Sequence, residues 1–446
     1  MFNKFKSVAV ALCICLVAVL FASCGGNKEG KAEVYFLNFK PESAETYEKI
    51  AAEYEKETGV RVKVVTAAAN TYEQTLKSEI AKSFPPTIFQ INGPMGFNSW
   101  RDYCADLSDS KIYSYLDDKS LAISENGAVY GIPFVVEGYG IIYNNEIMNR
   151  YFALDNKTVK ISSAKEITDF NTLKAVVEDM TKNKSKLGIE GVFGSTSLYS
   201  GEDWRWQTHL SNLAIHNEFK NGDTNTSLLL QNAKSINFTH SDKFKNVFDL
   251  YTNNSITDKK LLGSKSVADS MAEFALGKVA MIQNGNWAWS QISDIEGNKV
   301  KEKDIKFMPI YSGFDNEEKQ GLCIGTENFL AINSKASKES KDAALEFLDW
   351  LFSSEKGKKY VIEDLKFMTP FNTFNDDETP NDPLSAEVKS WLSKEGIETV
   401  PWSFTGYPGE KFKTDFGNAL LEYVQGNKKW DEVVSTVKNS WKEERE

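Results

Sequence analysis

The sequence predicts an α/β fold divided into two lobes. Near the beginning of the main part of the chain, apolar strand-like segments alternate with amphipathic helical segments, the pattern of a sheet covered by helices. The same alternation returns later in the chain. Without its first 23 residues the 446-residue chain has 423 residues, more than one hydrophobic core usually serves. We therefore expect two α/β lobes.

The first residues have the features of an export signal. Lys4 and Lys6 give a positively charged start, and residues 8–22 are almost wholly apolar. That apolar run is too short for a comfortable membrane span and ends in small residues, as secretory signals do. We expect these residues to be removed from the folded protein.

The end of this segment resembles the lipobox of bacterial lipoproteins. Leu20-Phe21-Ala22-Ser23-Cys24 precedes two glycines, although Phe21 stands where the motif usually has Leu. The resemblance implies a signal peptide of residues 1–23, lipidation of Cys24 with fatty acids such as palmitate, and a tether of residues 24–32. Two acyl chains anchor stably to a membrane. A plain secreted protein or an uncleaved anchor are the alternatives.

The charge and cysteine content narrow the class further. Loss of Lys4 and Lys6 changes the formal net charge from −11 to −13, which disfavours nucleic acids and anionic surfaces as partners. Cys104 and Cys323 remain in the mature chain, too few for a disulfide scaffold. They form either one bridge or two buried thiols.

The N-terminal half supplies the clearest elements. An amphipathic helix follows the first strand and ends at Gly59, a residue suited to a helix C-terminus. Another strand and helix follow, and Pro85-Pro86 ends the second helix before a third strand. In chain order the expected elements are a strand at 33–37, a helix at 44–58, a strand at 60–64, a helix at 72–82 and a strand from 88.

Ligand crevices in such sheets lie beyond the carboxyl ends of the strands. Asn38 and Asn92 directly follow two of the predicted strands, and a further loop follows Pro133. Both asparagines are therefore candidates for ligand contact.

Motifs of enzymes and metal sites are lacking in the sequence. It contains no Gly-x-Ser-x-Gly, His-Glu-x-x-His, phosphate-binding glycine loop, or Cys-x-x-Cys in the mature chain. No motif frames the three histidines, His209, His216 and His240, which are expected at the surface or in satisfied hydrogen bonds. Adjacent acidic residues are expected by chance among 63 Asp and Glu. We expect no catalytic residue, metal or cofactor.

The segment from residue 268 to 290 is the most informative. It predicts a helix to Leu276, a short strand at 279–282, and a turn at 284–286 that holds Trp287 near the strand end. A flat aromatic ring can stack on the weakly apolar face of a sugar, whose hydroxyls need directed amides and carboxylates. The segment therefore favours carbohydrate binding.

Three segments together resemble the carbohydrate class of extracellular solute-binding proteins, the maltose-binding protein family. They are Gly-Asn-Trp-Ala-Trp-Ser at 285–290, Gly-Ile-Pro-Phe-Val-Val-Glu at 131–137, and Glu-Thr-Gly-Val-Arg-Val at 57–62. The resemblance implies a two-lobe periplasmic-binding-protein-like fold, in which each lobe is a mixed sheet flanked by helices and the ligand cleft lies between the lobes. It also implies a monomer that captures a carbohydrate, expected to be an oligosaccharide, and delivers it to the membrane permease of an ABC transporter.

The same resemblance points to particular site residues. Trp287 would stack on the sugar and Glu137 would accept hydroxyl hydrogens, with Glu202 and Trp204 approaching from the second lobe. Asn286 and Trp402 complete the candidates together with the two asparagines named above. Alternative roles stay open: the tryptophans could be packed in the core, and Trp206 is the rival of Trp204. We expect Trp289 to pack within its lobe, and Glu137 could pair with a nearby backbone or basic group.

The family architecture also implies that each lobe is built from distant pieces of chain. The lobes would rotate about the crossing segments, and a bridging sugar would favour the closed form. A surface-anchored carbohydrate-active enzyme, a binder of polyamines or peptides, and a scaffold lipoprotein are the competing hypotheses. The expected ranges are 33–134 plus 326–368 for the first lobe, 139–322 plus 370–446 for the second, and crossings near 135–138, 323–325 and 369.

Overall fold

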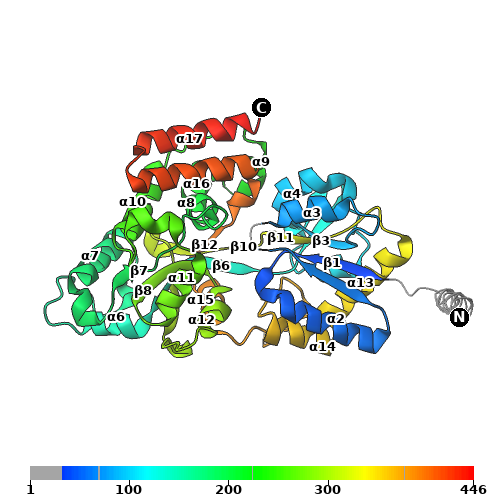
Figure 1. Ribbon diagram of the computed structural model, residues 1–446, viewed down its shortest axis with the longest axis horizontal. Coiled ribbons are helices and arrows are strands. Elements are labelled where there is room, and N and C mark those ends of the chain that lie inside the picture. The colour runs from blue at the N-terminus through cyan, green and yellow to red at the C-terminus, as the bar shows by residue number, and fades with distance from the viewer. Residues whose placement is uncertain (1–32, 69–70, 223–224, 376) are drawn as a thin grey trace, which may run out of the picture.

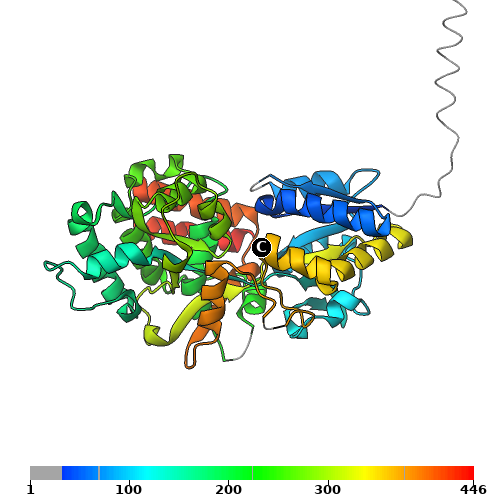
Figure 2. The same ribbon diagram turned by 90° about the horizontal axis from the view of Figure 1, so that it is seen from below.

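The computed structural model describes residues 33–68, 71–222, 225–375 and 377–446. The expected signal peptide, Cys24 and the tether lie outside these residues. Two six-stranded sheets, each covered by helices, form two lobes that lie side by side (Figures 1 and 2). The predicted two-lobe α/β architecture is confirmed.

The first sheet has the strand order β2-β1-β3-β11-β5-β4. Strands β1, β2 and β3 are parallel, whereas β11 runs antiparallel to β3 and to β5. The chain therefore returns to this sheet after completing most of the second one. The strand bounds are β1 Val34–Asn38, β2 Val62–Thr66, β3 Ile88–Asn92, β4 Ile123–Glu125, β5 Ala128–Pro133 and β11 Asn328–Ile332.

Helices cover both faces of this sheet because its central strands are apolar on both sides. In β1, Val34 and Phe36 pack in one core cluster with α2 and α13, while Tyr35 and Leu37 pack in another with α3 and α4. Figure 1 shows these helices on opposite sides of the sheet. The helices of this lobe are α2 Ala44–Thr58, α3 Tyr72–Ile80, α4 Gly93–Trp100, α5 Lys111–Ser114, α13 Lys338–Ser353 and α14 Glu355–Lys359.

The first predicted helix illustrates how local sequence sets these elements. Tyr47, Ile50 and Tyr54 recur at helical spacing and are buried on one face of α2. The helix ends at Gly59, whose φ of 69° is left-handed and whose N–H donates to the carbonyl of Glu55. Glycine reaches that conformation without a side-chain clash. The prediction of this helix and its end is confirmed.

The second sheet has β6 at its centre. Strands β8, β9 and β10 each pair antiparallel with β6, whereas β7 and β12 run parallel to β8 and β10. Strand β8 continues through Gly285, which pairs with Tyr139, so the turn expected at 284–286 begins later. The bounds are β6 Glu137–Asn144, β7 Gly191–Phe193, β8 Val279–Gly285, β9 Ile305–Met308, β10 Gln320–Gly325 and β12 Glu398–Pro401.

Helices also surround the second sheet, and a C-terminal helical pair, α16 and α17, lies above it in Figure 1. The late helices bring large aromatic side chains such as Phe412 and Trp441 into the second-lobe core. The bounds are α6 Asn145–Phe152, α7 Phe170–Leu187, α8 Ser211–Phe219, α9 Thr226–Asn232, α10 Ser241–Asn253, α11 Val267–Ala275, α12 Ala288–Ser293, α15 Pro383–Leu392, α16 Glu410–Gln425 and α17 Trp430–Glu443.

Three segments of chain connect the two sheets. The first joins β5 to β6, and the second joins β10 to β11 through Thr326 and Glu327. The third follows Met368, whose carbonyl accepts a hydrogen bond of 2.7 Å from the N–H of Val136 in the first segment. The connections therefore lie against one another, as a hinge between two lobes requires.

The third connection leaves the first lobe later than residue 369, the position expected from the sequence. Phe371 forms a β-bridge with Leu116, and Lys358 pairs with Glu378 at 2.5 Å. These contacts hold Phe371 and Glu378 beside first-lobe elements, whereas α15 packs on strands of the second sheet. We therefore assign this crossing to the chain between Glu378 and Pro383.

The two remaining cysteines are separate buried thiols rather than a bridge. Cys104 follows α4 in the first lobe and Cys323 lies in β10 of the second. Burial raises the pKa of each thiol to about 12, so both are protonated at neutral pH. Among the described residues, no helix is long and apolar enough to cross a membrane.

Candidate functional site

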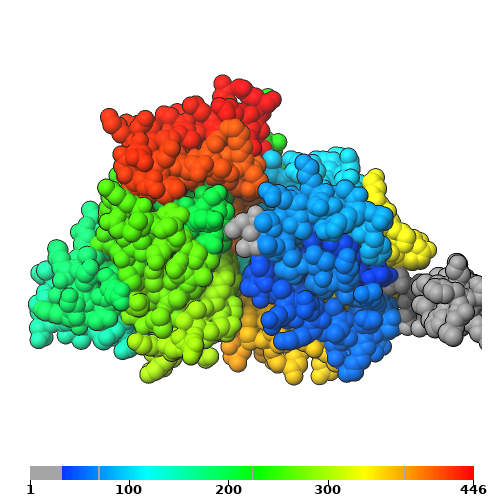
Figure 3. Space-filling view, viewed as in Figure 1, coloured from blue at the N-terminus to red at the C-terminus, as the bar shows by residue number. Residues whose placement is uncertain are grey.

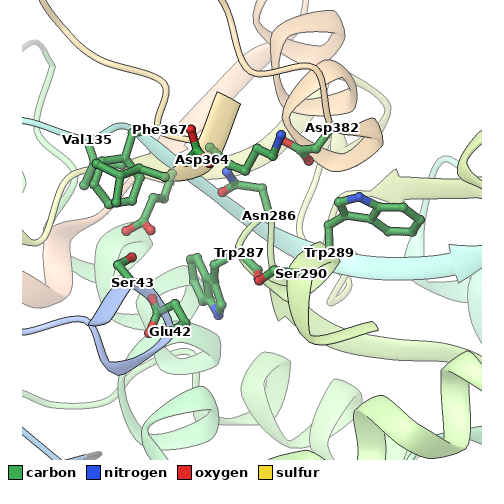
Figure 4. Close-up of a pocket in the computed structure, with 13 residues that line it drawn as sticks. Glu42, Ser43, Val135, Asn286, Trp287, Trp289, Ser290, Asp364, Phe367 and Asp382 are labelled. Atoms are coloured by element: carbon green, nitrogen blue, oxygen red, sulfur yellow. The ribbon is translucent and has the colours of Figure 1, made fainter. Parts of the chain in front are cut away.

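A pocket lies where the two lobes meet. The first lobe contributes Glu42, Ser43 and residues 364–367, and the segment that leads into β6 contributes Val135 and Glu137. The second-lobe side contributes residues 286, 287, 289 and 290 at the start of α12, and Asp382 lies just before α15 (Figure 4). The space is about 70 Å³, smaller than the 300 Å³ or more of ordinary ligand pockets. The lobes lie close together around it, as the space-filling view shows (Figure 3).

Trp287 occupies the wall of this pocket at the start of α12. Its partly exposed ring faces Glu42 and Ser43 of the first lobe (Figure 4). Trp289, two residues further on in α12, points away from Trp287 and packs on the second-lobe core. The two neighbouring tryptophans therefore have different surroundings.

Trp287 belongs to a group of rings that we term the aromatic cluster. Its ring centroid lies 6.0 Å from that of Trp204, 6.1 Å from Tyr139 and 6.4 Å from Trp402. Three of the sequence-predicted tryptophans thus come together on the second lobe. The members of the aromatic cluster are Tyr139, Trp204, His209, Trp287, Trp402 and Phe404.

Helical segments of the second lobe position two sides of this cluster. Trp204 precedes a π-helical segment, Arg205–Leu210, that carries His209, and such segments are frequent at functional sites. Trp402 precedes a short 3₁₀ turn that is held by Asn212 of α8, whose Oδ1 accepts the N–H groups of Ser403 and Phe404 at 2.8 and 3.1 Å.

His209 lies at the centre of the cluster and is buried. Burial lowers its pKa well below the ordinary value, and the nearby Arg205 charge lowers it further, so the ring is neutral. Its Nδ1 lies 3.0 Å from the hydroxyl of Thr208, while its Nε2 and the Nε1 of Trp402 lack hydrogen-bond partners among the described residues. The aromatic cluster thus contains two buried polar atoms that have no hydrogen-bond partner among the described residues.

Glu137 lies at the first connection and forms a buried ion pair. Its Oε1 accepts a hydrogen bond of 2.7 Å from Lys40 Nζ, and the two residues are 4 % and 6 % exposed. Burial alone would lower the pKa of Lys40, but the carboxylates of Glu137 and Glu42 outweigh it and raise that pKa. The pair joins the loop after β1 to the start of β6.

The three asparagine candidates have hydrogen bonds within the fold. Asn38 is buried, accepts from the N–H of Lys40, and donates to the Lys40 carbonyl and the Thr66 hydroxyl. Asn92 donates to Glu327 at 3.0 Å. Asn286 accepts from the N–H of Gly138 at 3.0 Å, and it alone of the three lines the pocket.

Glu202 also has a structural partner. Its Oε2 accepts a hydrogen bond of 2.6 Å from the N–H of Val267, the first residue of α11. A carboxylate at that position satisfies a free N–H group of the helix. Glu202 is therefore close to Trp204 in the sequence, but its carboxylate is hydrogen-bonded to the N-terminus of α11.

Several residues around the pocket were not among the sequence-based candidates. Lys40, Tyr139 and His209 contact candidate residues, and Glu42, Asp364 and Asp382 line the pocket. Tyr139 could have been found, because it lies two residues after Glu137 and therefore on the same side of β6. The described residues contain no group of three or more His, Cys, Asp or Glu side chains that could hold a metal ion.

Two mixed α/β lobes, joined by three connections and enclosing a pocket at their junction, define the class of two-lobe binding proteins. The chain belongs to the family of bacterial extracellular solute-binding proteins, because residues 49–388 match the model of that family. Members of this family bind solutes, so the protein is a binding protein and not an enzyme.

Known relatives agree with this assignment. The chain is 23 % identical to the melibiose/raffinose/stachyose-binding protein MelE of Bacillus subtilis over 74 % of each chain. It is 22 % identical to the multiple sugar-binding protein of Streptococcus mutans over 85 % of this chain and 86 % of the relative. A sugar transporter structure from Bacillus licheniformis in complex with stachyose has the same fold, with a TM-score of 0.66, 18 % identity and coverage of 92 % of this chain and 99 % of that one.

Proposed function

We propose that the protein captures a neutral carbohydrate, an oligosaccharide, outside the cell and delivers it to the permease of an ABC transporter. The observation that carries the proposal is the partly exposed Trp287 at the junction of the lobes, backed by Trp204 and Trp402. Flat aromatic rings stack on the C–H faces of sugars. The sugar-binding relatives support this choice of ligand.

The proposed mechanism is closure of the lobes around the sugar. The aromatic cluster would bind one face of the ring, and Glu42 and Ser43 of the first lobe would reach the other side in the closed form. Glu137 would accept a sugar hydroxyl through the carboxylate oxygen that Lys40 does not occupy. A ligand that contacts both lobes binds the closed form more tightly and shifts the population toward it.

The proposal further holds that Cys24 carries a lipid and anchors the protein to the outer side of the cell membrane, as a monomer. The lipobox-like sequence before Cys24 supports this part, as does the name of a Streptococcus pneumoniae relative, a maltooligosaccharide transporter solute-binding lipoprotein. Replacing Cys24 with Ala should release the protein from membranes into the medium. Retention of the Cys24→Ala variant on membranes would contradict a lipid anchor at this residue.

A thermal unfolding screen of residues 33–446 tests the choice of ligand. The panel contains melibiose, raffinose, stachyose and maltooligosaccharides, with a polyamine and a peptide mixture as controls. A ligand at about 100 times its Kd adds about 2.7 kcal/mol of stability. Stabilisation by a sugar that is recovered intact supports the proposal, whereas stabilisation by the polyamine or peptides alone would replace carbohydrate with that solute.

A further inference from the structure

Two glycines lie directly beneath tryptophans of the aromatic cluster. Gly285 ends β8 and Gly325 ends β10, and both strands pair with β6. Gly325 is opposite Glu137 and Gly285 is opposite Tyr139. Since opposite residues of paired strands point to the same side of a sheet, any side chains at both glycines would point to the side of Glu137 and Tyr139.

That space is occupied by indole rings. A Cβ atom on Gly285 would overlap three ring carbons of Trp287, well inside the 3.0 Å separation that real Cβ atoms keep. A Cβ on Gly325 would lie 2.7 Å from both Cβ and Cγ of Trp402. A rigid ring cannot bend away from such a contact, so the whole indole would have to move.

The backbone gives no separate reason for glycine at these positions. Neither Gly285 nor Gly325 is among the glycines with positive φ, so their extended conformation is open to other residues. Close approach of the rings to the strands is therefore the feature that glycine permits.

We infer that Gly285 and Gly325 are specificity-determining residues that set how deeply Trp287 and Trp402 lie against the second sheet. This inference rests on the proposed sugar-binding function. Trp287 lines the pocket, whose space is only about 70 Å³, so an alanine methyl group at Gly285 would push this ring into it and narrow the gap between the lobes. Trp402 is buried beside Trp287, with 6.4 Å between the ring centroids, so a methyl group at Gly325 would act on the pocket by displacing Trp402 against Trp287. The two glycines thereby fix the thickness of sugar that the closed lobes accept.

The binding test compares alanine variants of three glycines by titration calorimetry, using the sugar that best stabilises the wild-type protein. Gly285→Ala and Gly325→Ala should lower affinity about tenfold or more, as an added methyl group in a binding pocket does. Gly321→Ala is the matched control on β10, where the new Cβ would lie 2.9 Å from Ile397 Cγ2 and away from the cluster. It should lower the melting temperature and leave affinity unchanged. Equal affinity losses in all three variants, or none at 285 and 325, would overturn the inference.

A second test needs no ligand. Gly285→Ala should lower the urea midpoint of the wild-type protein but have little effect in a Trp287→Leu background, because the crowded ring is absent there. Equal losses in both backgrounds would overturn the inference even if sugar binding is established. Conversely, the stability losses could differ between the two backgrounds while no sugar binds. That result would support the packing of Trp287 on Gly285, but it would overturn the proposed function and the specificity role that depends on it.

Discussion

The two lobes contribute different chemistry to the cleft. On the first-lobe side, the polar side chains of Asn38, Lys40 and Asn92 bond to other parts of the protein. On the second-lobe side, Trp204 and Trp287 present partly exposed ring surface that no protein group fully covers. A polar side chain at a strand end therefore does not by itself indicate a ligand contact. We take Asn38, Lys40 and Asn92 as support for the hinge, and the partly exposed rings of the second lobe as the main sugar-binding surface.

The largest expected effect comes from breaking the buried ion pair on the first-lobe side. Lys40→Met leaves the Glu137 carboxylate buried without its partner, which should lower the free energy of unfolding by about 3–5 kcal/mol. Urea denaturation measures this loss. The double variant Lys40→Met/Glu137→Leu removes both charges and should recover most of the stability. A single variant as stable as the wild type would show that the pair does not support the hinge.

A pH effect is expected at the loop that carries Trp402, because His216 Nδ1 lies 2.7 Å from the hydroxyl oxygen of Ser403 in that loop. Burial and, to a smaller extent, the charge of Lys220 together lower the pKa of His216 to about 4, while the unfolded chain titrates near 6.5. The unfolded state therefore binds the proton more readily, and His216 makes stability fall as pH drops from about 6.5 to 4. Over this pH window, titration of His216 is expected to lower the free energy of unfolding by roughly 3 kcal/mol.

The matched variant for this effect is His216→Gln, which cannot titrate. Asp203 acts in the opposite direction, because burial raises its pKa to about 6 and its contribution therefore falls as pH rises through this window. The difference between the wild type and the variant isolates His216. Unfolding curves with the same pH dependence in both proteins would contradict the assignment.

A smaller effect on sugar affinity is expected from Arg205, which lies behind Trp204 on the second-lobe surface. The guanidinium of Arg205 is buried and lies 4.0 Å from the centre of the Trp204 ring, a cation–π contact of about 1 kcal/mol. Arg205→Met should lower sugar affinity about fivefold by loosening Trp204, and Arg205→Lys should lower it less. Titration calorimetry tests both variants. Unchanged affinity in the Arg205→Met variant would show that Arg205 does not hold Trp204 in place for sugar binding.

The sequence predicted the elements that periodicity and helix-ending residues define. The apolar spacing in α2 and the helix-ending Gly59 fixed that helix, and the Gly-Asn-Trp segment placed Trp287 at the lobe junction. Trp287 was predicted because the segment at 268–290 indicates a strand that ends in a turn, and Trp204 was predicted from the resemblance to the family.

The polar contacts could not be predicted in the same way. Lys40 and Glu137 are 97 residues apart, and the bond from Glu202 to Val267 spans 65 residues. No spacing rule connects such pairs, because tertiary packing alone brings them together. The same reason explains the third lobe crossing, which the contacts of Phe371 and Glu378 with the first lobe delay beyond residue 369.

The most direct test of the account compares two partly buried tryptophans by titration calorimetry with the stabilising sugar. Trp287 lies in the aromatic cluster, whereas Trp350 lies on the first-lobe helix α13, where its Nε1 donates to Glu57. Trp287→Ala should weaken binding by about 2 kcal/mol or more, roughly 30-fold, and Trp350→Ala should bind as the wild type does. Wild-type affinity in Trp287→Ala would contradict the central claim that the second-lobe aromatic cluster binds the sugar.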